Sequence, residues 1–219
     1  MSFSIRQLIN PSDKELDETA DVLAKAFEYS YFLSALGGNR ELVVPFLRAH
    51  LNAALLEGEI YVVEVPTDGI VGGAVWFGPQ HKFISTPEQR AAGWDDIMAK
   101  LEPKFQKFWD QFLVDYDDLC ETSFGPGVKL ASYHLQVFGV VPDYQRRGFG
   151  RALIEAVADK AKPKGDTLVL ETMGETRVAI YKAMGFKMAG SGSVRGVNDA
   201  DWVFYCLKRP TAPDTETTT

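Results

Sequence analysis

Residues 134–151, HLQVFGVVPDYQRRGFGR, constrain the fold more than any other stretch of this chain. The first eight are rich in β-branched and aromatic side chains in alternating order, which predicts a strand that Pro142 ends. The run RALIEAVADKAK at 151–162 is typical of a helix. In a regular strand the side chains divide between two faces, with Leu135, Val137, Gly139 and Val141 on one and His134, Gln136, Phe138 and Val140 on the other.

The turn between this strand and helix has the composition of a phosphate site. Free backbone N–H groups in the first turn of a helix, together with the helix dipole, favour an anion. Gly148 and Gly150 allow close approach of the backbone, and Arg146 and Arg147 add charge and forked donors. So short a pattern is also compatible with a plain loop.

Two motifs resemble the GNAT superfamily of acetyl-CoA-dependent N-acetyltransferases. The first is VVP at 140–142 with QRRGFG at 145–150, which fits the family pattern V-x-P followed by (Q/R)-x-x-G-x-(G/A) at a helix start. The second is YKAMGF at 181–186, which fits Y-x-x-x-G-F. The resemblance covers 130–208 closely and the first 78 residues more loosely. Within the superfamily, the segment from 171 to 186 is most similar to the puromycin N-acetyltransferase branch.

The resemblance implies an α/β (α+β) GNAT fold: a central mixed, mostly antiparallel sheet of six to seven strands, helices on both faces, and a V-shaped splay between two central strands. It implies one domain at 1–209, followed by a polar tail at 210–219 that we expect to be disordered. Periodicity and turn residues predict the remaining elements. The expected strands are 3–9, 59–65, 70–78, 167–172, 186–191 and 201–209, and the expected helices are 13–35, 40–57 and 175–184, with a loop at 193–199.

Residues 79–129 depart from the family, which often joins the flanking strands by a short loop. Apolar residues recur there at a spacing of three to four, which predicts amphipathic helix. We expect the helix to begin at Pro87 and to be split or kinked at Pro103. This helical insertion before the cofactor-binding strand is either a packed decoration or a lid over an acceptor pocket, and both interpretations are compatible with its sequence.

The resemblance implies acetyl-CoA as the cofactor and assigns the residues that hold it. The pyrophosphate would lie on the amides of 146–151, with Gln145 capping the turn. Backbone groups of the central strand would bond the pantetheine arm, and the Val140 N–H would polarise the thioester carbonyl. Arg177 stands where many members have Asn, so it either pairs with a phosphate or faces solvent. The expected cofactor-binding residues are Phe138, Gly139, Val140, Gln145, Arg146, Arg147, Gly148, Phe149, Gly150, Arg151, Arg177 and Tyr181.

The family reaction needs an acid for the leaving thiolate and a base for the amine. By position Tyr181 is the general acid, and its unperturbed pKa of about 10 is close to that of a thiol; packing beside the pantetheine arm is the alternative. His134 matches the strand histidines of some members and is the first choice as base, acting through water, unless it merely packs. Glu171 is the second choice, unless it is a structural hydrogen-bond acceptor.

The expected function is transfer of acetyl to the primary amine of a small, partly aromatic or apolar molecule by direct attack in a ternary complex. The resemblance places the acceptor between the first two helices and the C-terminal strands, near Tyr29, Tyr31, Phe32 and Trp76. Three other interpretations remain: a protein or peptide N-acetyltransferase, a non-catalytic acyl-CoA-binding module, and a nucleotide-binding βαβ unit. The last lacks the third glycine of its motif, because Leu153 occupies that position.

Composition limits the partners. The chain has 219 residues, 46% of them hydrophobic, and a net charge of −7, which disfavours a nucleic-acid partner. No run approaches 18 apolar residues, so we expect no membrane partner. Cys120 and Cys206 lack metal or redox spacing, so we expect no metal. The start of the chain does not resemble a signal peptide, and we expect a cytoplasmic monomer or homodimer.

Overall fold

A computed structural model describes residues 2–197 and 200–212. They form a seven-stranded sheet in the order β1-β2-β3-β4-β5-β7-β6. All neighbouring strands are antiparallel except β4 and β5. The mixed, mostly antiparallel sheet predicted from the sequence is therefore confirmed. The strands are β1 (Ser4–Gln7), β2 (Glu59–Val65), β3 (Gly69–Phe77), β4 (Tyr133–Val140), β5 (Thr167–Thr172), β6 (Lys187–Arg195) and β7 (Asp201–Pro210).

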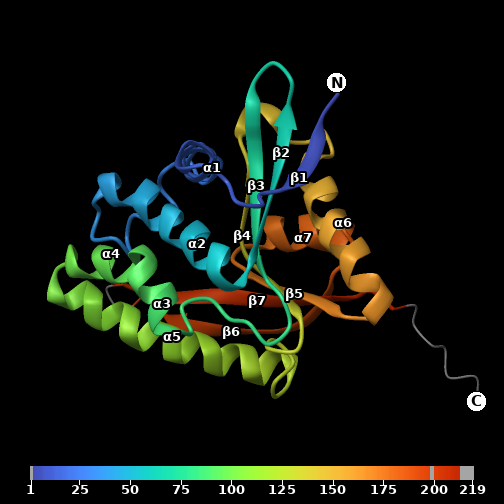
Figure 1. Ribbon diagram of the computed structural model, residues 1–219. Helices are drawn as coiled ribbons and strands as arrows, with labels where there is room; N and C mark the ends of the chain where they lie inside the picture. The colour runs from blue at the N-terminus through green and yellow to red at the C-terminus, as the bar shows by residue number, and fades with distance from the viewer. Residues whose placement is uncertain (1, 198–199, 213–219) are drawn as a thin grey trace, which may run out of the picture.

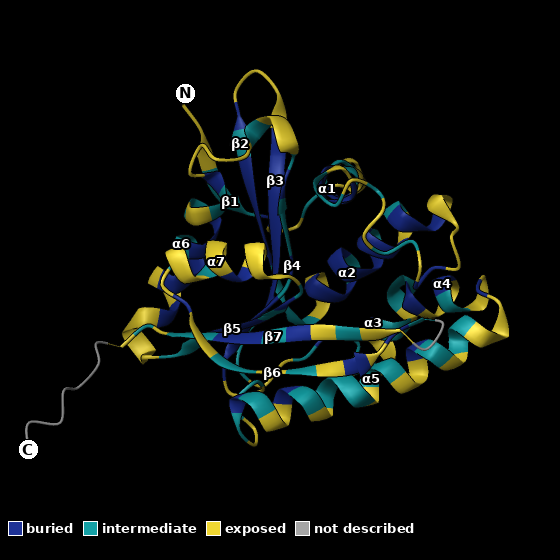
Figure 2. Cartoon of the chain, turned by 180° about the vertical axis from the view of Figure 1, so that it is seen from behind, coloured by how far each residue is buried: buried dark blue, intermediate teal, exposed yellow. Residues whose placement is uncertain are grey.

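Helices cover both faces of the sheet (Figure 1). Helices α1 and α2 pack on one face of β1–β4, α6 packs on the other, and α5 lies along β6 and β7. Figure 2 shows β2 to β5 mostly buried between these layers, whereas β6 carries several exposed residues. The longer helices are α1 (Asp13–Ala26), α2 (Val43–Glu57), α5 (Pro103–Phe124), α6 (Phe149–Ala161) and α7 (Glu175–Ala183), and the short ones are α3 (Pro87–Gln89) and α4 (Asp95–Ala99).

The sheet opens between its two central strands. The parallel ladder of β4 and β5 contains only two register pairs, Tyr133 with Leu168 and His134 with Val169. Beyond them the strands diverge, and β5, β7 and β6 run across the direction of β1–β4 (Figure 1). The predicted V-shaped splay is thus present, with its apex at His134 and its open end at the C-terminal half of β4.

A bulge in β4 changes which side chains share a face. Val75 of β3 pairs with Val137, but Trp76 pairs with Leu135, so Gln136 is an extra residue without a partner. Leu135 consequently packs in the core cluster under α6, whereas Val137 packs in the cluster under α1 and α2. The predicted regular alternation through residues 134–141 is wrong, because a one-residue bulge reverses the faces on one side of it.

The insertion is a packed part of the core. Trp94, Ile97, Leu101 and Trp109 join the cluster formed by α1 and α2, and the Trp109 indole donates to the carbonyl of Ala35 at 2.9 Å. The helix breaks as expected at Pro103, which begins α5. The structure therefore supports the packed-decoration interpretation of 79–129.

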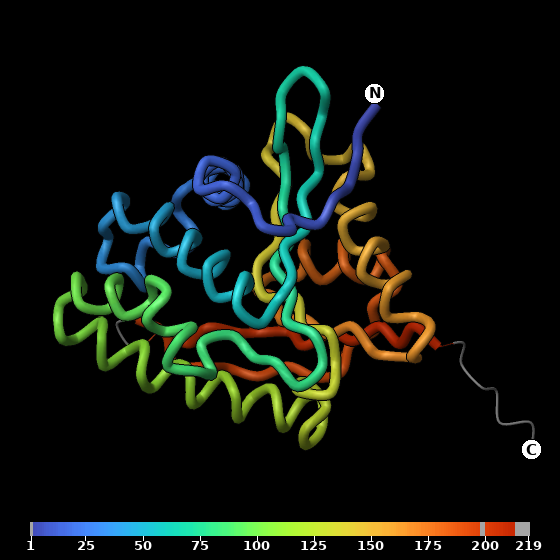
Figure 3. Tube along the Cα trace, viewed as in Figure 1, coloured from blue at the N-terminus to red at the C-terminus, as the bar shows by residue number. Residues whose placement is uncertain are grey.

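Three predicted boundaries differ from the structure. Helix α1 ends at Ala26 instead of near residue 35, because Glu28 and Tyr29 adopt left-handed backbone angles (φ +53° and +52°). The chain then turns irregularly through 27–38 before α2, as the trace in Figure 3 shows. Strand β6 continues to Arg195, into the predicted loop. Of the predicted disordered tail, Pro210 belongs to β7, and 213–219 lie outside the described residues.

Candidate active site

The predicted phosphate turn has the backbone geometry of an anion cradle. Arg146 and Gly148 both have positive φ, +61° and +87°, and such left-handed residues in a turn direct successive N–H groups inward. Gly148 is also the N-cap of α6, which has no side-chain cap, so the first N–H groups of this helix remain available. A Cβ built on Gly148 would meet no atom within 4 Å, so the turn borders open space.

The strand leading to this turn presents backbone donors to the splay. Val141 donates its N–H to Val71 of β3 at 3.0 Å. Because N–H groups alternate along a strand, Phe138 and Val140 direct theirs away from β3, toward the open side. The Gly139 N–H points toward β3 instead. A Cβ built on Gly139 would lie 2.6 Å from the Cβ of Ala26 in α1, so the helix packs directly on this residue. The Gln145 side chain donates to the Val140 carbonyl at 3.0 Å, which ties the turn to the strand end.

Several predicted cofactor side chains are engaged within the protein. The Phe149 ring is buried, with its centroid 4.7 Å from that of Phe3, and Arg151 donates to the Ala183 carbonyl at 2.6 Å. Phe149 can therefore offer an anion only its backbone N–H, whereas Arg151 keeps further guanidinium donors beside the one bound to Ala183. The Arg147 guanidinium lies 5.0 Å from the Tyr144 ring centroid.

Arg177 also has partners within the chain. It donates to the Met173 carbonyl at 3.1 Å and covers the Tyr31 ring at 5.1 Å. The side chain thus links α7 to the segment between α1 and α2. This contact brings Tyr31 to the splay and leaves Arg177 engaged with the protein.

Tyr181 projects from α7 toward the cofactor strand. Its ring centroid lies 6.2 Å from that of Phe138 and 5.8 Å from that of Phe186. Burial, and next the neighbouring Tyr31 hydroxyl, raise the pKa of Tyr181 above its usual value. The phenol therefore keeps its proton at neutral pH.

His134 and Glu171 meet at the apex of the splay, in a buried polar cluster. His134 Nε2 lies 2.7 Å from Glu171 Oε2, which also accepts from the Tyr116 hydroxyl at 2.8 Å. The other oxygen, Oε1, lies 3.1 Å from Cys120 Sγ and 3.2 Å from Lys129 Nζ. The carboxylate thus has four side-chain partners, from β4, from α5 and from the loop that joins them.

The charges in this cluster fix the state of the imidazole. Burial opposes ionisation of Glu171, but Lys129 and His134 hold the pKa of its carboxyl well below the usual range. Burial, and then Lys129, lower the pKa of His134. At neutral pH we therefore assign a neutral imidazole that donates from Nε2 to the carboxylate, which leaves Nδ1 as its basic atom.

The four predicted acceptor residues do not form one group. Trp76 is fully buried in the cluster under α6, Phe32 packs against Phe46 with centroids 5.1 Å apart, and Tyr29 donates to Asp21 at 2.6 Å. Tyr31 alone among them reaches the splay, beside Tyr181. Aromatic side chains at these positions mainly build the core.

Sequence reasoning missed Tyr116, Cys120 and Lys129. None belongs to a short motif, and 51 positions separate Cys120 from Glu171. One feature of the sequence could have indicated that Tyr116 and Cys120 act together: they are four residues apart on a predicted helix, so they share one of its faces.

Comparison with known proteins agrees with this geometry. Residues 111–188 match the model of the family described as Acetyltransferase (GNAT) domain. This segment is similar to a GNAT acetyltransferase domain and covers 78 of the 219 residues. The matched segment includes the anion turn, Tyr181, and all of β4 and β5.

Two relatives extend the comparison. The [Ribosomal protein bS18]-alanine N-acetyltransferase of Escherichia coli (strain K12) is 43% identical over 53 residues, 23% of this chain and 36% of that protein. The match thus spans about a third of that relative. A histone acetyltransferase HPA2 and related acetyltransferase from Corynebacterium glutamicum ATCC 13032 shares 19% identity at a TM-score of 0.61 over 98% of this chain and 99% of its own.

A solved ribosomal-protein-S18-alanine N-acetyltransferase from Escherichia coli shares 14% identity at a TM-score of 0.55, over 100% of this chain and 99% of its own. Both structural likenesses show the fold. Neither distinguishes a puromycin-type branch, which stays a prediction. Among the helices of residues 2–197 and 200–212, none is long and apolar enough to cross a membrane.

Proposed function

We propose that this protein is an N-acetyltransferase that transfers acetyl from acetyl-CoA to the primary amine of a small molecule, by direct attack in a ternary complex. The observation that carries the proposal is the two-pair ladder between β4 and β5. It leaves the C-terminal half of β4 with unpaired donors that lead directly into an uncapped helix N-terminus. Together these groups form a continuous track for an anion and an extended amide-bearing arm.

The residues on this track fit acetyl-CoA. Gly148, which borders open space, and the N–H groups of 149–151 suit a pyrophosphate, and the N–H groups of Phe138 and Val140 suit the pantetheine amides and the thioester carbonyl. Bound acetyl-CoA supplies the acetyl group as a thioester. A fixed donor such as the Val140 N–H, directed at the carbonyl oxygen where charge develops, contributes about 3–4 kcal/mol.

His134 and Tyr181 carry out the two proton transfers, one from the amine and one to the thiolate. The neutral imidazole of His134 accepts a proton from the amine at Nδ1, directly or through water, while Glu171 fixes the ring through Nε2. Tyr181, protonated at neutral pH, donates to the departing thiolate from the α7 side. Glu171 is thus proposed as the residue that positions His134, because both of its oxygens are occupied by partners.

A second candidate function is acetylation of a protein N-terminus. The similarity to the bS18-alanine N-acetyltransferase favours it, but that match covers 53 residues of this chain. All of residues 1–110, which carry α1, α2 and the first part of the insertion, lie outside the family match. Amines and N-terminal peptides are therefore both assayed as acceptors.

Acetyl-CoA binding and acetyl transfer to amines and N-terminal peptides test the proposal, with wild type beside Gly148→Glu and Tyr181→Phe. We expect wild type to bind acetyl-CoA and Gly148→Glu to lose binding, because a carboxylate would occupy the anion turn. Tyr181→Phe should bind but turn over slowly. Absence of acetyl-CoA binding by folded wild type would refute an enzyme function, and turnover of peptides only would favour the second candidate.

A further inference from the structure

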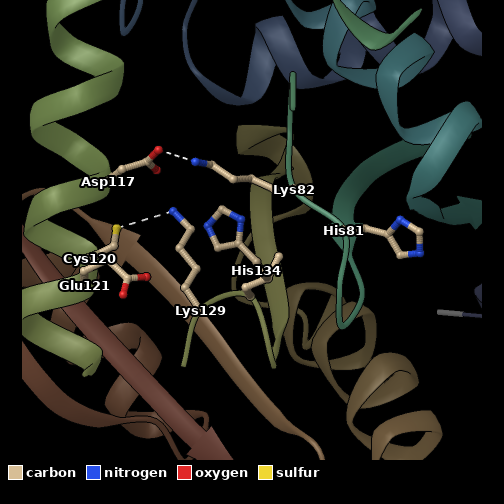
Figure 4. Close-up of a pocket in the computed structure, with 8 residues that line it drawn as sticks. His81, Lys82, Asp117, Cys120, Glu121, Lys129 and His134 are labelled. Atoms are coloured by element: carbon tan, nitrogen blue, oxygen red, sulfur yellow. Dashed lines mark hydrogen bonds and ion pairs between the residues drawn. The ribbon is translucent and has the colours of Figure 1, made fainter. Parts of the chain in front are cut away.

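A cavity of about 220 Å³ lies next to His134, on the α5 side of the sheet. Its wall is formed by α5, the chain following β3, and the segment leading into β4. Figure 4 shows the α5 residues Asp117, Cys120 and Glu121 projecting toward Lys82 and Lys129. No aromatic ring of Phe, Tyr or Trp lines it, and Leu130 is its one aliphatic residue. Of the aromatic residues predicted to bind the acceptor, Trp76, Phe32 and Tyr29 pack in or against the core, and Tyr31 lies beside Tyr181; none of the four lines this cavity.

The charges around the cavity do not balance. Lys82 pairs with Asp117 at the wall, and Lys129 pairs with Glu171 behind it. Glu121 uses Oε2 to accept the Gly127 N–H at 2.8 Å, and within the described residues no cation pairs with it. The Lys82–Asp117 pair is about two-fifths exposed, and such pairs exchange partners at little cost. One carboxylate, and a second that can be released, therefore face the space beside the proposed base.

We propose that this cavity binds the acceptor, and that the acceptor is a short hydrophilic amine carrying a second ammonium group. The second ammonium lies between Glu121 and Asp117, which are four residues apart and share one face of α5. The reacting amine lies at the His134 end. This inference rests on the proposed function, because it takes His134 as the base.

The volume limits the acceptor. An apolar cavity of about 150 Å³ holds benzene, so by proportion this one holds roughly nine heavy atoms. A diamine with a four-carbon chain has six heavy atoms and fits within this volume, whereas a nucleoside amine exceeds it. The exposed wall is mostly apolar, from the stems of the lysines and from Leu130, which suits the methylene chain of a diamine, while its ammonium groups suit the carboxylates.

The test compares 1,4-diaminobutane with butylamine, which has the same chain and lacks the second ammonium. Steady-state acetyl transfer is measured for wild type, Glu121→Gln and the control Asp118→Asn, an exposed residue on the same helix. Gln keeps an acceptor for the Gly127 N–H and removes the charge. We expect Glu121→Gln to raise KM for the diamine about tenfold and to leave butylamine unchanged, and Asp118→Asn to change neither.

The outcomes separate this inference from the proposed function. If wild type binds acetyl-CoA and acetylates aromatic amines or peptides, but Glu121→Gln and Asp118→Asn behave alike with every amine, the cavity is not the acceptor site while the enzyme function stands. If acetyl-CoA does not bind, the proposed function itself fails. Equal KM values for the diamine and butylamine in wild type would also overturn the assignment of the second ammonium.

Discussion

Replacing Lys129 with methionine tests the proposed role of the buried cluster. Lys129 Nζ lies 3.2 Å from Glu171 Oε1, and the two side chains are 11% and 1% exposed. Removing one partner of a buried ion pair costs about 3–5 kcal/mol. In the variant, among the residues that the structure describes, His134 is the remaining side chain beside Glu171 that can carry a positive charge. We therefore expect the pKa of His134 to rise, since burial and Lys129 are the influences that lower it and one is removed.

The sign of the pH dependence follows from linkage. In wild type the folded pKa of His134 is below its unfolded value, so the unfolded state binds more protons as pH falls below about 6.5 and stability is lost at about 1.4 kcal/mol per pH unit. In Lys129→Met the protonated imidazole pairs with Glu171, and this loss disappears or reverses. Between pH 6.5 and the folded pKa of His134 in wild type, the stability difference between the two proteins should therefore shrink by up to about 1.4 kcal/mol per pH unit.

Two measurements follow this change. Urea unfolding of both proteins from pH 5 to 8 gives the free energies, and an NMR titration of the imidazole protons gives the pKa directly, because the chain has three histidines. Lys107→Met, an exposed position on α5, is the control and should shift stability by less than about 0.5 kcal/mol. Lys129→Arg keeps the charge and should keep the low pKa. A folded Lys129→Met protein whose His134 titrates as in wild type would refute the reasoning.

Three further predictions concern the framework. Gly139→Ala should destabilise the protein by about 1–3 kcal/mol in urea unfolding, because its Cβ would lie 2.6 Å from that of Ala26; a change below 0.5 kcal/mol would show that α1 shifts freely. Ser12→Ala should lower the free energy of unfolding by about 1 kcal/mol, because Ser12 forms a capping box with Glu15; an equal loss in Glu15→Ala but none in Ser12→Ala would contradict this. The buried imidazole of His50 should titrate at about 4, since burial lowers its pKa, and an NMR titration midpoint near 6.5 would be inconsistent with its packing.

Local patterns predicted the elements whose signal lies within a short window. Strand β5 was predicted with its observed bounds from a buried β-branched run, and the start of α5 from Pro103. The end of α1 could not be predicted in this way, because residues 27–35 keep an apolar helical spacing. The segment after these residues packs against α2 through Phe32 and Phe46 and against α5 through Ala35 and Trp109, contacts that local propensity does not encode.

Only the parts of the candidate site that lie within a sequence motif could be predicted. The anion turn and Tyr181 lie in family patterns, so their positions followed from the sequence. The partners of Glu171 do not, because Tyr116 and Cys120 of α5 and Lys129 of the loop after it meet Glu171 only through tertiary packing. A polar residue on an amphipathic helix predicts a solvent-facing side chain far more often than a buried hydrogen bond.

The bulge at Gln136 explains how one strand can serve both halves of the proposed reaction. In a regular strand His134 and Phe138 would share a face, as the sequence pattern predicted. With one extra residue between them, His134 faces α5 and the cavity, whereas Phe138 faces α6 and Tyr181. The proposed base and acid therefore lie on opposite faces of the sheet, and the splay between β4 and β5 is the opening that joins them. An amine arriving from the α5 side and a cofactor arriving from the α6 side would meet there without competing for space.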